Sequence, residues 1–190
     1  MGLCDERAGR RALLKGGIGL GIGLCLAPAG SGQDNPASIR PKEGDLLVKV
    51  DDPSATPLTP ADIRLAGAQI DAWAMDPADK TIRSGSRLNR VLLLRFDPAQ
   101  LSEETKPRAA DGVIAFTAIC THSGCEVSEW IAQQQQLYCP CHSSAFDPRD
   151  AGKVVAGPAP RRLPGLPLKI EEGKLVVAKP FIGRVGFERA

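Results

Sequence analysis

Several features that direct a protein to a particular class of partner are scarce in this sequence. The formal net charge is only +2, so nothing indicates a general attraction to nucleic acid or to an anionic membrane surface. Aromatic residues make up 4% of the 190 residues, whereas glycine (20) and proline (16) are abundant. This balance favours a loop-rich β fold over a helical bundle. The length suits one domain, or one domain with a small insert.

A hydrophobic run long enough to cross a membrane is also lacking. Residues 16–27 are apolar but rich in glycine, and they fall short of the roughly 20 residues that a spanning helix needs. Arg10 and Arg11 precede this run in a pattern typical of twin-arginine export signals, and Ala27-Pro28-Ala29 follows it as an A-x-A cleavage pattern. The sequence therefore predicts a signal peptide over residues 1–29, cleaved rather than kept as an anchor, and a periplasmic protein.

The remaining chain is expected to be a linker followed by one β domain. Residues 30–44 are polar and interrupted by proline, which predicts a flexible linker, and residues 45–190 are the predicted domain. Residues 97–111 are charged and are expected to be a solvated surface excursion rather than a docking loop. Apolar and β-branched runs predict strands over 46–50, 69–75, 90–96, 112–119 and 153–155, and hairpins over 126–138 and 166–178.

Histidine is the rarest metal-binding residue in the chain, and its placement is informative. There are two histidines and six cysteines, and residues 120–142 contain both histidines and four of the cysteines. Thiolates and imidazoles in equal number suit a two-iron cluster in which two cysteines hold one iron and two histidines the other. There are two alternatives: a structural zinc site, or structural disulfides with histidines that bind no metal. Zinc would not explain the second cysteine of each of the two boxes, Cys120-Thr121-His122-Ser123-Gly124-Cys125 and Cys139-Pro140-Cys141-His142-Ser143-Ser144.

These two boxes resemble those of the Rieske [2Fe-2S] proteins. The resemblance implies one [2Fe-2S] cluster, with Cys120 and Cys139 on the inner iron and His122 and His142 on the outer iron. It also implies an all-β fold of stacked antiparallel sheets, in which a small cluster-binding subdomain at about residues 118–160 is inserted in a β base. Both imidazoles are then expected at the exposed tip, where electron uptake can be coupled to protonation.

The resemblance assigns roles to further residues around the cluster. In the disulfide-bearing branch of the family, the positions of Cys125 and Cys141 are bonded to each other, and an exported protein permits such a bond. Ser144 matches a serine that donates to a bridging sulfide in high-potential members, whereas Phe146 replaces a tyrosine that donates to a cysteine ligand. The proline-rich loop that covers the cluster in respiratory members is matched by Gly157, Pro158, Ala159 and Pro160.

Three functions from this family were compared. The first is an exported electron-transfer protein, the small subunit of an oxidoreductase similar to arsenite oxidase, which has no substrate site of its own and serves a larger catalytic subunit or a cytochrome c-type acceptor. Phe146 and Ser123, which stands where quinol-oxidising members have leucine, favour it. The alternative is the Rieske subunit of a quinol:cytochrome c reductase in a membrane complex, with the leader kept as an anchor.

The third function, a ferredoxin component of a ring-hydroxylating oxygenase, is disfavoured. The predicted export signal speaks against it, as do Cys125 and Cys141, which the cytosolic branch of the family lacks. A 2-His-1-carboxylate iron site is excluded as well, because the chain has no third histidine.

Overall fold

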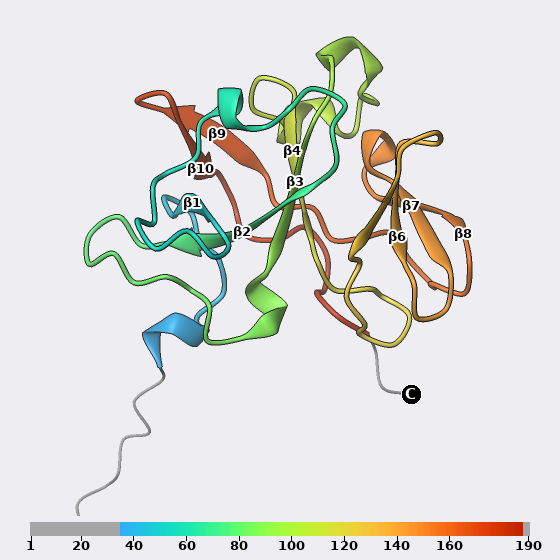
Figure 1. Ribbon diagram of the computed structural model, residues 1–190, viewed down its shortest axis with the longest axis horizontal. Coiled ribbons are helices and arrows are strands. Elements are labelled where there is room, and N and C mark those ends of the chain that lie inside the picture. The colour runs from blue at the N-terminus through green and yellow to red at the C-terminus, as the bar shows by residue number, and fades with distance from the viewer. Residues whose placement is uncertain (1–34, 188–190) are drawn as a thin grey trace, which may run out of the picture. The chain divides into compact units, whose positions relative to one another are not determined.

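The computed structural model describes residues 35–187, which form two antiparallel β-sheets joined by loops and short 3₁₀ helices (Figure 1). The predicted signal peptide and residues 30–34 of the predicted linker lie outside the described residues. Within the described range, no helix is long and apolar enough to span a lipid bilayer.

The larger sheet has six strands in the order β4-β3-β2-β1-β10-β9. Its two end strands approach each other, because Phe116 of β4 bridges Gly165 and the amide of Leu166 donates to the carbonyl of Ala115 at 2.9 Å. The sheet is therefore curved into a barrel-like base. Its strands are β1 (Leu46–Lys49), β2 (Ile70–Met75), β3 (Val91–Arg95), β4 (Val113–Thr117), β9 (Leu168–Glu171) and β10 (Lys174–Val177).

The smaller sheet has four strands in the order β5-β6-β7-β8 and is inserted between β4 and β9. Figure 1 shows the chain leaving the base after β4, building this sheet on the right, and returning for β9 and β10. An all-β fold with a small subdomain inserted in a β base is thus confirmed. The inserted strands are β5 (Glu129–Ile131), β6 (Gln136–Cys139), β7 (Ser144–Asp147) and β8 (Lys153–Ala156).

Short 3₁₀ helices turn the chain between strands, and three of them begin in the same way. Asn35, Asp97 and Asp147 each precede a proline, and each side chain accepts a hydrogen bond from the amide two residues further on. Proline fixes φ for the turn while the carboxylate or amide oxygen satisfies a free amide. The helices are η1 (Pro36–Ser38), η2 (Pro60–Asp62), η3 (Arg87–Asn89), η4 (Pro98–Gln100), η5 (Lys106–Arg108) and η6 (Pro148–Asp150).

The strand β3 is apolar on both of its faces, because the two faces pack against different cores. Val91 and Leu93 point into the interior of the base, together with residues of β1, β2 and β10. Leu92 and Leu94 point the other way, into a second core that contains Leu137 and other residues of the inserted sheet. This arrangement explains the uninterrupted apolar run that begins at residue 91, since alternation is expected only where one face meets water.

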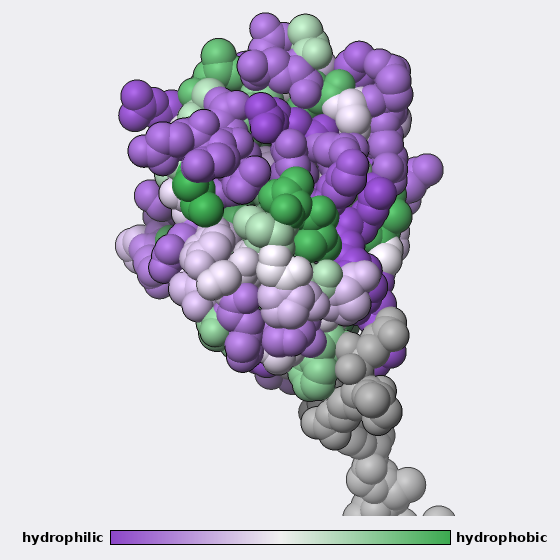
Figure 2. Space-filling view, turned by 90° about the vertical axis from the view of Figure 1, so that its right-hand side faces the viewer, coloured by the Kyte–Doolittle hydropathy of each residue, from purple (hydrophilic) through white to green (hydrophobic). Residues whose placement is uncertain are grey.

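The outward surface of the inserted sheet is mainly hydrophilic. Figure 2 looks onto this side of the molecule and shows a small hydrophobic group surrounded by polar residues. The edge strand β8 contributes Val155, which is 44% exposed. Most apolar side chains of the subdomain are therefore turned toward the base rather than toward solvent.

Most predicted strands are confirmed, and one was missed. The structure forms β1 to β4, β8, the β5–β6 hairpin and the β9–β10 hairpin close to the predicted ranges. The sequence predicts no strand at Phe146 and Asp147. Both residues instead belong to β7, which pairs with β6 and with β8. A four-residue strand with three consecutive buried residues shows no alternation that could have identified it.

Residues 97–111 are not simply a solvated excursion, and this part of the prediction is wrong. Leu101 and Thr105 are buried. The Thr105 hydroxyl donates to the Arg149 carbonyl at 2.8 Å and accepts from the Ala151 amide at 2.8 Å. The loop therefore joins the base to the subdomain at η6, although its charged residues Glu103 and Lys106 do face solvent.

Residues 36–44, which composition assigned to a flexible linker, pack on the base. Arg40 donates to the carbonyl of Leu88 at 2.7 Å, and the buried Asn89 side chain donates to the carbonyl of Ile39 at 2.8 Å. Directly after this segment, the carboxylate of Asp45 accepts two hydrogen bonds from Arg83, and both side chains are almost fully buried. These bonds and burial fix the start of the domain, so the described part of the predicted linker is ordered by tertiary contacts.

Candidate metal centre

The first cluster loop, residues 120–125, follows β4 directly. The amide of Cys120 donates to the carbonyl of Cys125 at 2.8 Å, and the amide of Gly124 donates to the carbonyl of Cys120 at 3.1 Å. These bonds fold the loop into a tight turn with His122 and Ser123 at its tip. Gly124 has φ +78°, a conformation that side chains other than glycine rarely adopt.

The second cluster loop, residues 139–144, is the turn between β6 and β7. Cys139 ends β6 and Ser144 begins β7, and the two residues are paired across the strands. Ser143 has a left-handed backbone with φ 58°, which lets the chain reverse over so few residues. The predicted hairpin of β5 and β6 carries the chain from the first loop back to Cys139, as Glu129 pairs with Tyr138.

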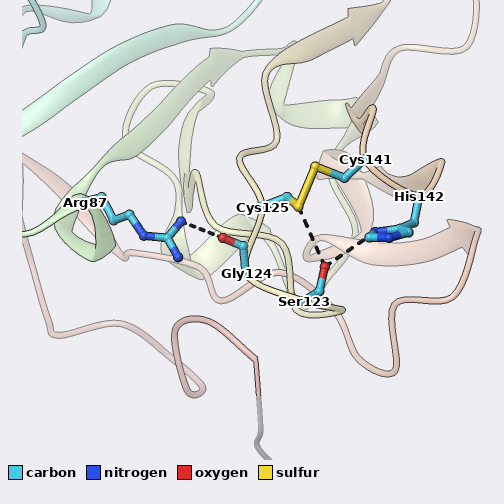
Figure 3. Close-up of a disulfide and its surroundings, with 6 residues drawn as sticks. All are labelled: Arg87, Ser123, Gly124, Cys125, Cys141 and His142. Atoms are coloured by element: carbon cyan, nitrogen blue, oxygen red, sulfur yellow. Dashed lines mark hydrogen bonds between the residues drawn. A yellow bond between two sulfur atoms is a disulfide. The ribbon is translucent and has the colours of Figure 1, made fainter.

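The two cluster loops are joined by a disulfide between Cys125 and Cys141, with Cα atoms 6.5 Å apart (Figure 3). This confirms the pairing that the family resemblance implied. The bond links the end of one loop to the middle of the other, so neither loop moves independently.

The remaining cysteines of the boxes, Cys120 and Cys139, are free thiols and both are buried. Burial raises the pKa of the Cys139 thiol above its ordinary value, and the adjacent Cys120 adds to that shift. Two buried thiols this close together are unfavourable as a pair of free thiolates. A cation that binds both would remove the penalty, because metal binding deprotonates a coordinating thiol.

The two histidines lie toward solvent from the thiols and face each other. Their ring centroids are 4.6 Å apart and the ring planes are nearly perpendicular. His142 is exposed, whereas His122 is half-buried and its Nδ1 is buried with no hydrogen-bond partner among the described residues. A buried nitrogen without a partner is costly unless it binds something, and a lone pair on imidazole is a good metal ligand.

These four side chains therefore form two pairs of donors, one of sulfur and one of nitrogen. Within residues 35–187, no three His, Cys, Asp or Glu side chains form a group that could hold a single metal ion. A Rieske cluster takes only two protein ligands on each iron, cysteines on one and histidines on the other. The donor set present fits that cofactor.

Ser144 lies behind this donor set with a hydroxyl that is fully buried. Its oxygen accepts a hydrogen bond from the amide of Ala159 at 3.2 Å, which connects the predicted covering loop to β7. Within the described chain its own hydrogen has no bonded acceptor, so it is available as a donor. Phe146 is also fully buried and packs in the core that contains Cys120 and Cys139. It brings no hydroxyl to the site.

Two residues near the first loop were not given a role by sequence reasoning. The Thr121 hydroxyl donates to the carbonyl of Arg161 at 2.6 Å, and the Arg87 guanidinium donates to the carbonyl of Gly124 at 2.6 Å (Figure 3). Thr121 lies within the first of the two cysteine and histidine boxes, so the sequence could have indicated that it is close to the site. Arg87 is 37 residues away from its partner, and no local pattern could have identified it.

Comparison with known proteins identifies a family for the part of the chain that contains these side chains. Residues 91–167 match the family model described as Rieske [2Fe-2S] domain. The chain is 52% identical over 135 residues to the cytochrome bc1 complex Rieske iron-sulfur subunit of Corynebacterium diphtheriae, with 67% of this chain and 33% of that protein covered. It is 29% identical over 147 residues to the protein of the same name from Streptomyces lividans, with 76% and 85% covered.

The matched region thus spans about a third of the length of the Corynebacterium relatives. Among solved structures, the chain is similar to the cyanobacterial plasma membrane Rieske protein PetC3 from Synechocystis PCC 6803, with 26% identity, a TM-score of 0.40, and 63% of this chain and 93% of that chain covered. It is also similar to the soluble domain of the Rieske protein II from Sulfolobus acidocaldarius, with 23% identity, a TM-score of 0.40, and 53% and 67% covered.

The family match begins at β3, includes both cluster loops, and ends at the segment that closes the base. It therefore contains all four donor side chains described above. Residues 91–167 are therefore a Rieske [2Fe-2S] domain, a domain that binds one [2Fe-2S] cluster.

Proposed function

We propose that this chain is the Rieske iron-sulfur subunit of a quinol:cytochrome c reductase. The observation that carries the proposal is the similarity to relatives named as cytochrome bc1 complex Rieske subunits, one of them 52% identical over 135 residues. These relatives favour this function over a small subunit similar to arsenite oxidase, which the sequence reading preferred. That preference rested on Ser123 and Phe146, which concern the rim and the potential of the site rather than its architecture, and on a weak likeness of residues 181–184 and of the exported single domain.

In this proposal Cys120 and Cys139 hold the inner iron, and His122 and His142 hold the outer iron. The cluster supplies a one-electron carrier whose potential is raised by its neutral imidazole ligands. The buried thiols keep water from the inner side of the site. The exposed His142 imidazole would accept a hydrogen bond from a quinol hydroxyl and so position the quinol. The bound cluster would take one of the two electrons of the quinol and pass it to a cytochrome c-type acceptor, and the second electron would go to another redox partner in the complex.

The proposed location follows from the same function. The twin-arginine pattern at Arg10 and Arg11 would export the folded protein to the periplasm, and a membrane complex favours a leader that is kept as an anchor. Changing both arginines to lysine should trap the protein in the cytoplasm. An N-terminus at Gly30 on the exported protein would contradict the anchor, whereas an intact leader on protein extracted only with detergent would support it.

The function is tested by isolating the chain from its native membrane and measuring cofactor and partners together. We expect two irons and two labile sulfides per chain, an EPR signal with average g below 2 on reduction, and co-purification with b-type and c-type cytochromes. The isolated complex should transfer electrons from quinol to cytochrome c. Stoichiometric zinc without iron would contradict the cluster, and co-purification with one large catalytic subunit in place of the cytochromes would instead favour the function similar to arsenite oxidase.

A further inference from the structure

The first cluster loop is held from outside the inserted sheet, and the second is not held in the same way. Arg87, at the start of η3 in the base, reaches across to the first loop and donates to the carbonyl of Gly124 at 2.6 Å. Figure 3 shows this bond on the side of the loop away from His142. A bond from a charged donor is stronger than one between neutral groups, so it restrains this part of the loop.

The C-terminal segment, residues 181–187, approaches the same loop. A Cβ added to Gly124 would lie 2.8 Å from Cδ1 of Phe187, so the Phe187 ring lies directly against this glycine. The same added atom would lie 3.5 Å from Nη2 of Arg87. Gly124 is therefore enclosed between a guanidinium from the base and an aromatic ring from the chain end.

Arg161 connects the C-terminal segment to the other end of the loop. Its guanidinium donates to the carbonyls of Arg184 at 2.7 Å and Gly186 at 2.5 Å, and its own carbonyl accepts from the Thr121 hydroxyl at 2.6 Å. The segment thus reaches the loop on both sides of His122, through Arg161 to Thr121 and through Phe187 to Gly124.

Apart from these bonds, the C-terminal segment is only partly packed: Phe181 is half-buried against the core of the base, whereas residues 182–184 are exposed. With Arg40, Pro41 and Leu88 it borders a cavity of about 500 Å³, and Ile182 is 43% exposed. Its backbone also bonds to the base through the amide of Ile182, which donates to the carbonyl of Gly165 at 2.8 Å. Loss of the contacts at Gly124 should therefore loosen this part of the first loop and leave both apolar cores intact, while the Thr121 bond and the disulfide remain.

We propose that Arg87 and residues 181–187 form a clamp on the first cluster loop that fixes the orientation of His122. This rests on the proposed role of His122 as an iron ligand. Arg87 and Phe187 act as positioning residues, because both contact Gly124 and, within the described residues, no hydrogen bond joins either of them to His122. The disulfide restrains both loops, whereas the contacts of Arg87 and Phe187 with Gly124 act on the first loop alone.

The clamp is tested by hydrogen exchange of the loop amides, which does not require a loaded cluster. Arg87→Gln and Phe187→Ala should each raise the exchange rates of the Cys120 and Gly124 amides by about five- to tenfold, as expected for loss of one restraining contact. Arg87→Lys, which keeps a charged donor, should restore part of the protection. In the loaded protein, both variants should also broaden the EPR lines of the reduced state.

Matched controls are available at the far end of the base. Leu65 bridges Arg95 at the end of β3, whereas the first cluster loop follows the end of β4 that pairs with Val91, the other end of β3. Arg64→Gln and Leu65→Ala remove comparable exposed side chains there and should leave loop exchange unchanged. Wild-type exchange rates in both Arg87→Gln and Phe187→Ala would overturn the proposal. Faster exchange in a protein that binds no iron would uphold the clamp and contradict the proposed function.

Discussion

The base and the inserted subdomain are built from the same kind of strand but are held together differently. The base encloses an apolar interior to which strands on all sides contribute, and Leu93, Leu175 and Val177 are fully buried there. The subdomain has four short strands, and its core is completed by residues of β3 and β4. A disulfide and the two pairs of proposed cluster ligands take the place of further apolar packing. Small units commonly need such covalent or metal links, because little apolar surface can be buried.

The difference between the base and the subdomain should be largest when a proposed cluster ligand is removed. Cys139→Ser should abolish iron and labile sulfide binding, because only one thiolate remains for the inner iron. Hydrogen exchange should then increase strongly in β5 to β8 and little in β1 to β3, since the interior of the base is complete without the cluster. Metal analysis and exchange mass spectrometry measure this. Full retention of iron and sulfide by the variant would contradict the ligand assignment.

The next largest difference between the base and the subdomain is expected when one buried leucine is truncated in each of them. Leu93→Ala and Leu137→Ala each remove a fully buried side chain and should each lower the free energy of unfolding by about 2 to 5 kcal/mol. Only Leu137→Ala should also speed the loss of iron to a chelator, because Leu137 packs in the core that contains the two thiols. Denaturant unfolding and chelation kinetics provide the measurements. Equal rates of iron loss would mean that the two cores are not independent.

Removing the disulfide tests how much of the stability of the subdomain depends on this covalent link. The double change Cys125→Ser and Cys141→Ser should leave a cluster that assembles but is labile. It should lower the free energy of unfolding by about 2 to 4 kcal/mol, as expected when a disulfide that closes a loop of this size is removed. The base should keep its exchange protection. Comparison with either single change controls for a free thiol that reacts further. Undiminished cluster lifetime in the double variant would show that the cluster and β-pairing suffice.

A smaller effect is expected when the buried hydroxyl of Ser144 is removed. Reduction adds negative charge to the cluster, so a hydroxyl that donates to a sulfur stabilises the reduced state more than the oxidised state. If the difference is about 1 to 2 kcal/mol, Ser144→Ala should lower the midpoint potential by about 40 to 90 mV. Phe146→Tyr should raise it. An unchanged midpoint in Ser144→Ala would mean that the buried hydroxyl does not reach the cluster.

The smallest effect concerns an ion pair between the loop after β3 and the segment that returns from the subdomain to β9. Glu104, in the loop after β3, accepts a hydrogen bond from Arg162 at 2.6 Å, and this bond together with Arg108 lowers the pKa of Glu104 from its ordinary value of 4.5. Because the folded-state pKa is depressed, the stabilisation is present above the unfolded-state pKa and is lost as the pH falls through the folded-state pKa.

Arg162→Ala should therefore reduce stability slightly at neutral pH and have little effect in acid. Thermal unfolding of both proteins between pH 7 and pH 3 measures the difference. The expected effect is small because both side chains are nearly half exposed to solvent. A constant difference between the two proteins across this pH range would show that Arg162 acts through packing rather than charge.

The sequence alone determined the cofactor class and most of the strands. Two boxes of cysteine and histidine are short-range patterns, and the chemistry of their donors hardly depends on what surrounds them. The strands β1 to β4 follow from local runs of apolar residues. The pairing of Cys125 with Cys141 also followed, although from family resemblance rather than from any property of the two residues themselves.

Only the tertiary structure decided which distant residues support the site. Arg87 reaches Gly124 over 37 positions and Asp45 pairs with Arg83 over 38, and such contacts leave no periodicity in the sequence. The strand β7 was missed for the same reason, because its buried residues are defined by the sheets on either side. A local sequence pattern indicates which side chains of a segment are buried. Which distant segment packs against them depends on the tertiary fold, and the local pattern does not contain that information.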